Sequence, residues 1–240
     1  MKNSELASKL KEHFAKQSVI TTKEITEVLV NAFPELSAST ISWRLNQLKK
    51  EKLIYQTGRG LYSFVFKPEY TPYFSLKAKR LYNRIKPLCK ADLSMWDTQT
   101  LNDIGETSVD RYWMFLSTNK EELEPLFENM LDFSKHTFLQ PDKEVVSRYL
   151  MAHNEAVIIT PLVSETPLYK SGEYTTPTIE GLLVNVWLKY ESYLKPIGFD
   201  IKTLYEQAFK KYSVNQSKLL RYAARRDKRK EINEFIKSIA

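Results

Sequence analysis

Hydroxyl, amide and ammonium side chains gather along residues 37–50, a stretch that opens with serine and reads as a helix. The apolar residues Ile41, Leu45 and Leu48 would share one face of that helix. The residues on the opposite face and at its edges are Ser39, Thr40, Ser42, Trp43, Asn46, Gln47, Lys49 and Lys50. Amide and hydroxyl groups can hydrogen-bond to base edges in the major groove, and lysine can bind phosphate. The chemistry that this face predicts is therefore DNA recognition.

A β-hairpin is expected directly after this helix. Two β-prone runs, LIYQ and LYSFVF, are joined by residues 57–60, with the sequence TGRG. The two glycines permit the positive φ angles that a tight hairpin needs. Arg59 would then lie at the hairpin tip, where a basic residue can contact the DNA backbone or the minor groove.

The residues upstream complete an ordered set of elements. We expect a first helix over residues 4–16, a very short strand at Val19-Ile20 and a second helix that ends before Pro34. The apolar stripes of these helices are Leu6, Leu10 and Phe14, and then Ile25, Val28, Leu29 and Ala32. Three helices and a hairpin predict a winged helix-turn-helix over residues 1–68. The alternative is that a domain of this kind binds another protein and no DNA. The polar face and the basic hairpin favour DNA.

Residues 69–240 predict a second domain, which follows a proline-containing linker at 67–72. Strand-like and helix-like segments alternate between residues 91 and 160, which indicates a small, mostly parallel or mixed sheet. The expected strands are 91–96, 109–118, 136–140 and 156–163, and the expected helices are 76–88, 98–104, 119–133 and 142–152. From Pro177 onward the pattern is helical, and its first helix is apolar on most sides. The fold class expected for the chain is α/β (α+β), with the winged helix first and a helical C-terminal part last.

Basic charge is concentrated at the two ends of the chain, whose total net charge is +7. Residues 1–70 carry a net charge of +4, residues 71–209 one of −4 and residues 210–240 one of +7. Six basic residues lie close together in the last segment: Arg221, Arg225, Arg226, Lys228, Arg229 and Lys230. On one helix they would form a binding surface for phosphate or for an acidic protein patch. The alternative is that these cations only stabilise the C-terminus of a helix through its dipole. Six basic residues are more than that stabilisation needs, so we favour a binding surface.

Catalytic motifs are absent from the sequence, so we expect no enzyme activity, no cofactor and no metal ion. The chain has no phosphate-binding glycine loop and neither a nucleophile nor a zinc-protease motif. Cys89 is the only cysteine, and the three histidines are scattered, at His13, His136 and His153. A Mg²⁺-dependent nuclease is the remaining enzymatic alternative, and it rests on Asp97, Asp103 and Asp110 alone. We interpret these acids as helix caps and surface charge.

The sequence also bears on the location of the protein. No apolar run approaches the roughly 18 residues of a transmembrane helix. The first residues are charged throughout and lack the apolar segment of a signal peptide. We therefore expect a cytoplasmic protein with no membrane partner, associated with the nucleoid when it is bound to DNA.

Four segments of the chain carry a resemblance to a known family. They are SMWDTQTLNDI at 94–104, TPLVSETPLY at 160–169, TPTIEGLLVNVW at 176–187 and KLLRYAARRDKR at 218–229. Together with the expected N-terminal domain, they resemble the antitoxins of type IV abortive-infection systems, the AbiEi-like proteins. The likeness covers nearly the whole chain and is closest to uncharacterised bacterial relatives of that family.

The resemblance implies an autorepressor and antitoxin of a phage-defence system. Its N-terminal domain would bind inverted repeats in the promoter of its own operon, as double-stranded DNA. Its C-terminal domain would counter a nucleotidyltransferase-type toxin, and direct binding between the two proteins is not assumed. A stand-alone transcription regulator with a ligand-sensing α/β domain is the alternative outside this family.

Overall fold

A computed structural model describes residues 2–15, 17, 19–132 and 134–239 of the chain. These residues form two compact units: residues 2–69 with 212–217, and residues 70–211 with 218–239. The structure is mixed α/β, as the sequence predicts, and each unit has its own apolar core. Within the described residues, no helix is long and apolar enough to cross a membrane.

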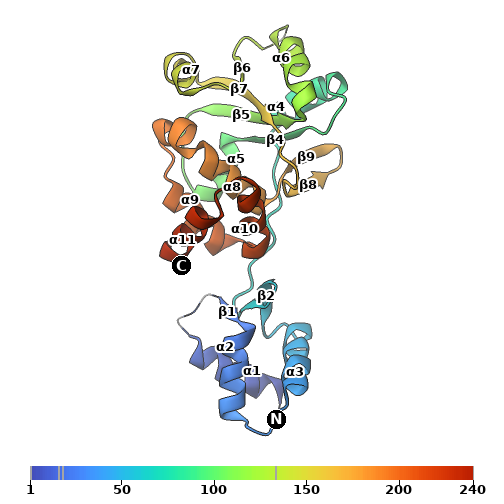
Figure 1. Ribbon diagram of the computed structural model, residues 1–240, viewed down its shortest axis with the longest axis vertical. Helices are drawn as coiled ribbons and strands as arrows, with labels where there is room; N and C mark the ends of the chain where they lie inside the picture. The colour runs from blue at the N-terminus through green and yellow to red at the C-terminus, as the bar shows by residue number, and fades with distance from the viewer. Residues whose placement is uncertain (1, 16, 18, 133, 240) are drawn as a thin grey trace. The chain divides into compact units, whose positions relative to one another are not determined.

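Three helices make up most of the N-terminal unit (Figure 1): α1 (Asn3–His13), α2 (Thr22–Ala32) and α3 (Ala38–Lys50). The helix α2 begins with a capping box, in which the Thr21 hydroxyl accepts a bond from the Glu24 backbone N–H and the Glu24 carboxylate accepts one from the Thr21 N–H. The side chain of Ser37 caps α3 in the same way, through the Thr40 N–H. Lys16, the predicted end of the first helix, lies outside the described residues.

The predicted apolar stripes of these helices build the core of the unit. The core residues from the three stripes are Leu6, Leu10 and Phe14, then Ile25 and Leu29, and then Ile41, Leu45 and Leu48. Val28 packs against this core from its edge. The prediction was wrong for Ala32, the last residue of α2, which is exposed.

A small antiparallel sheet closes the unit, in the strand order β1-β3-β2. Its strands are β1 (Ile20–Thr21), β2 (Tyr55–Gly58) and β3 (Leu61–Ser63). The last strand is shorter than predicted, because β1 and β2 offer pairing partners only as far as Ser63. Of the two hairpin glycines, Gly60 has a positive φ, of 71°. Gly58 belongs to β2, where it pairs with Leu61 of β3, and its φ is not positive.

The C-terminal unit contains a four-stranded mixed sheet, as predicted, in the order β4-β5-β7-β6. Its strands are β4 (Ser94–Asp97), β5 (Tyr112–Thr118), β6 (Thr137–Leu139) and β7 (Glu155–Pro161). The last three are parallel to one another, and β4 is antiparallel to β5. The carboxyl ends of the three parallel strands therefore lie along one edge of the sheet.

Helices cover both faces of this sheet (Figure 1). One face packs against α4 (Leu76–Ile85) and α6 (Leu123–Leu131), with Tyr82, Met114 and Leu126 in a shared core. The buried face of α4 contains Ala78, Tyr82 and Ile85, whereas Leu76 at its start is 71% exposed. The shorter helices that connect the strands are α5 (Thr98–Gly105) and α7 (Lys143–Arg148). Phe133, at the predicted end of the helix after β5, lies outside the described residues.

The remaining elements are a hairpin and four helices. They are β8 (Leu168–Ser171), β9 (Tyr174–Pro177), α8 (Ile179–Lys189), α9 (Ile201–Lys211), α10 (Gln216–Arg225) and α11 (Arg229–Ile239). A π-helical segment, η4 (Tyr190–Leu194), continues α8. The short 3₁₀ turns are η1 (Lys86–Leu88), η2 (Lys120–Glu122), η3 (Leu150–Ala152) and η5 (Lys195–Ile197). Pro177 was predicted to open the apolar helix, but it ends β9, because Thr178 is the N-cap residue of α8.

Candidate functional site

The outer face of α3 is exposed, as the helical spacing predicts. Ile41, Leu45 and Leu48 are buried on the opposite side. The exposed residues of the outer face are Ser39, Ser42, Trp43, Asn46 and Lys50, and the partly exposed ones are Thr40, Gln47 and Lys49. This division leaves one amide and one ammonium group, on Asn46 and Lys50, a helical turn apart and open to solvent.

Trp43 is the largest exposed group on this face, with 53% of its surface accessible. The guanidinium of Arg44 lies 5.3 Å from its ring centroid. Arg44 also donates a hydrogen bond to the side chain of Asn3 over 3.0 Å, which ties α3 to α1. The indole is thus held beside a cation, as a flat apolar surface next to polar groups.

The hairpin is fixed to the helices at both ends. Lys49 donates to the side-chain oxygen of Gln56 in β2, over 3.2 Å. At the tip, the Thr22 backbone N–H donates to the Gly60 carbonyl over 2.8 Å. Arg59, next to that glycine, is exposed. The predicted hairpin residue therefore sits on a turn that α2 holds in place.

The basic C-terminal surface is not built as predicted. A single helix was expected through residue 229, but α10 ends at Arg225 and α11 begins at Arg229. The break occurs because Asp227 adopts a left-handed conformation with φ of 55°, and the Lys228 N–H bonds back to the Ala223 carbonyl. The six cations therefore do not lie on one helix.

Those six cations have different environments. Arg225 forms an ion pair with Glu165, and Lys228 pairs with Glu231 over 2.7 Å. Arg226 is partly buried and lines a cavity. The other three, which stay exposed, are Arg221, Arg229 and Lys230.

That cavity, which also contains Lys189, is not predicted by any pattern in the sequence. Burial, followed by the charge of Arg226, lowers the pKa of Lys189 to about 7. In the sequence, Lys189 falls within the largely apolar helical pattern that begins at Pro177. A lysine at the end of an otherwise apolar run was the one signal that could have drawn attention to it.

Most of the chain matches a known family model. The model of a family of unknown function, DUF6577, matches residues 40–240. The chain belongs to this family. The match begins within α3 and includes the hairpin and the whole C-terminal unit. A search of curated proteins found no match.

Of the three aspartates of the nuclease alternative in this DUF6577 protein, one caps a helix and two are exposed. Asp97 is buried as the N-cap of α5, and it also accepts a hydrogen bond from the Tyr112 hydroxyl over 3.1 Å. Asp103 is exposed and accepts from Gln99, and Asp110 is exposed just before β5. Among the described residues, no group of three acidic, histidine or cysteine side chains is arranged to hold a metal ion.

Two histidines that are far apart in sequence meet in the structure. The rings of His136 and His153 stack with centroids 3.8 Å apart. Burial, and then the charge of His136, lowers the pKa of His153. The description of the histidines as scattered was therefore wrong for this pair, because parallel pairing of β6 and β7 brings their preceding loops together.

Proposed function

We propose that this DUF6577 protein is a DNA-binding transcription regulator whose N-terminal unit acts as a winged helix-turn-helix. The observation that carries the proposal is the outer face of α3, where Asn46 and Lys50 are exposed beside Trp43. In this reading α3 enters the major groove, where Asn46 meets a base edge and Lys50 a phosphate. Arg59 meets the backbone or the minor groove from the hairpin.

The bonds around this face support preorganised binding. Ser37 and Thr40 share the hydroxyl network that starts α3, and Lys49 is bonded to Gln56 in the hairpin. The bonds from Thr22 to Gly60 hold the turn that carries Arg59. Groups that are already ordered lose less conformational entropy when they bind.

The regulator is further proposed to be a cytoplasmic autorepressor and antitoxin of a type IV toxin–antitoxin system. Support comes from the resemblance of the sequence to AbiEi-like antitoxins. Its functional partner would be a nucleotidyltransferase-type toxin encoded next to it, and its DNA partner the inverted repeats of its own promoter. No direct toxin complex is required by this proposal.

The DNA-binding part is tested by a gel-shift titration at fixed salt. The wild-type protein is titrated against a fragment from upstream of its own gene and against an unrelated fragment of equal length. We expect the promoter fragment to bind about a thousandfold or more tightly, as is typical of specific sites. Equal affinity for both fragments contradicts sequence-specific regulation.

The antitoxin part is tested by growth. The neighbouring gene is expressed alone and together with this protein, and colony formation is scored. The proposal expects growth arrest with the neighbour alone and recovery on co-expression. Arrest without recovery supports the stand-alone regulator instead.

A further inference from the structure

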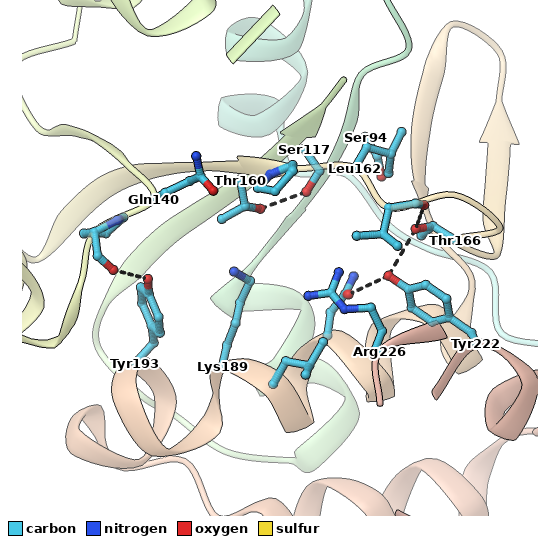
Figure 2. Close-up of a pocket in the computed structure, with 15 residues that line it drawn as sticks. Ser94, Ser117, Gln140, Thr160, Leu162, Thr166, Lys189, Tyr193, Tyr222 and Arg226 are labelled. Carbon is cyan, nitrogen blue, oxygen red and sulfur yellow. Dashed lines mark hydrogen bonds between the residues drawn. The ribbon is translucent and has the colours of Figure 1, made fainter. Parts of the chain in front are cut away.

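A cavity of about 240 Å³ lies at the carboxyl edge of the C-terminal sheet (Figure 2). Ser117 of β5 and Thr160 of β7 are neighbours in the parallel register, and their hydroxyls are 3.1 Å apart. The antiparallel strand β4 places Ser94 opposite Ser117. Phe115 and Ile158 precede Ser117 and Thr160 by two residues on the same strands, so they lie on the same face of the sheet. They form an apolar layer next to the hydroxyl layer, further from the carboxyl ends of the strands. Open α/β sheets bind ligands at this edge.

Two cations enter the cavity: Lys189 from the end of α8 and Arg226 from the turn that follows α10. Figure 2 shows Lys189 rising from the end of α8 toward Thr160 and Ser117, with Arg226 beside it. In the part of the chain that the structure describes, no aspartate or glutamate lines this cavity or forms an ion pair with either cation. By contrast, Arg225, which directly precedes Arg226 in the sequence, forms an ion pair with Glu165.

Neutral polar groups complete the walls. The Tyr222 hydroxyl donates to the Asn185 side-chain oxygen over 3.2 Å and accepts from Thr166 over 3.1 Å. Because Asn185 accepts through its oxygen, its amide nitrogen remains a donor. Tyr193 donates to the Pro141 carbonyl over 2.8 Å, which closes the far side of the cavity.

Lys189 and Tyr193 lie four residues apart, at the junction of α8 with the π-helical segment η4. Lys189 is the last residue of α8, and Tyr193 follows within η4. Lys189 Nζ lies 5.2 Å from the ring centroid of Tyr193. Widened turns of this kind occur frequently at functional sites.

We propose that this cavity binds the phosphoryl group of a small phosphorylated molecule, with Lys189 and Arg226 as its cationic contacts. Two like charges that face each other without a carboxylate are costly unless an anion joins them. The strand hydroxyls of Ser94, Ser117 and Thr160 and the amide nitrogen of Asn185 can donate to a ligand. Donors on more than one side match the acceptor oxygens of a phosphoryl group better than the two oxygens of a carboxylate. The volume is below the roughly 300–1,000 Å³ of typical ligand pockets, so a small molecule is expected.

The test is calorimetric titration of the full chain with three probes: inorganic phosphate, AMP and malonate. The variants are Lys189→Met and Arg226→Gln. The matched controls are Lys195→Met, an exposed lysine that pairs with Glu191, and Arg229→Gln, an exposed arginine at the start of α11. Thermal melts confirm that each variant is folded, and Arg226→Gln keeps the test valid if Lys189→Met does not fold.

The expected result is binding of phosphate or AMP by the wild type and by both controls. Each cavity variant should bind about tenfold or more weakly, as expected for the loss of a charge-assisted hydrogen bond. The proposal is overturned by no binding of either phosphate probe, by preference for malonate, or by equal binding in the cavity variants. A single-stranded oligonucleotide that binds through Lys189 and Arg226 when phosphate and AMP do not also overturns it.

Discussion

Lys189 stands over the ring of Phe115, with its Nζ 5.1 Å from the ring centroid. A cation is attracted to an aromatic face, and this contact holds the ammonium group at the hydroxyl layer of the sheet. Burial and the nearby Arg226 oppose the charged form and bring the pKa of Lys189 to about 7. Near neutral pH this side chain therefore exists in both charged and neutral forms.

The first prediction concerns anion affinity and pH. The other ionisable groups lining the cavity are Arg226, Tyr193 and Tyr222. Sulfate, which keeps one charge state between about pH 6 and pH 9, should bind more weakly as pH rises through the pKa of Lys189, because the ammonium loses its proton. Calorimetric titration of sulfate in the wild type and in Lys189→Met checks this, and only the wild type should show the decline.

The second prediction concerns stability. Lys189 has a pKa of about 7 in the folded protein, whereas an unfolded lysine has one of about 10.4. Between these values the unfolded state holds more protons, so the Lys189 contribution to the free energy of unfolding should rise with pH. Above this range the tyrosines act in the opposite direction, since burial raises the pKa of Tyr193 to about 12. Urea titrations from about pH 7 to pH 10 should show a steeper rise in the wild type than in Lys189→Met.

The third prediction separates base contact from phosphate contact on α3. Asn46→Ala should cost about 1–3 kcal/mol on promoter DNA and little on unrelated DNA. Lys50→Ala should weaken both and reduce the slope of log affinity against log salt by about 1. Salt titrations of both fragments provide the measurement. If Asn46→Ala weakened binding to both fragments equally, the assignment of Asn46 to a base edge would be wrong.

The fourth prediction tests the packing under α8. A Cβ on Gly181 would lie 2.8 Å from the Pro167 carbonyl oxygen, which already accepts a bond from the Thr178 N–H. Overpacking of this kind costs about 1–3 kcal/mol, whereas the helix propensity of alanine alone would add about 1 kcal/mol of stability. We expect Gly181→Ala to unfold at lower urea concentration than the wild type. A variant more stable than the wild type would contradict the close approach of the Pro167 loop.

Periodicity was enough to predict α3, because Ile41, Leu45 and Leu48 recur at helical spacing and nothing interrupts them. Periodicity did not predict the helix break at residues 226–228, where Asp227 adopts a left-handed conformation. The sequence has no glycine or proline there that would indicate the end of a helix. Periodicity also could not find the cavity, whose residues come from several strands and helices that only tertiary packing brings together. Local spacing predicts a face of one element, whereas a pocket depends on long-range topology.

The most direct test of the proposed function is promoter binding by a variant that lacks the three exposed contacts. Fluorescence anisotropy with a labelled promoter duplex compares the wild type with a triple variant, Asn46→Ala, Lys50→Ala and Arg59→Ala. Lys11→Ala, which removes an exposed cation from α1, is the matched control. We predict that the triple variant binds the promoter no better than unrelated DNA, while the control binds like the wild type. A triple variant that keeps wild-type affinity for the promoter would contradict DNA recognition by α3.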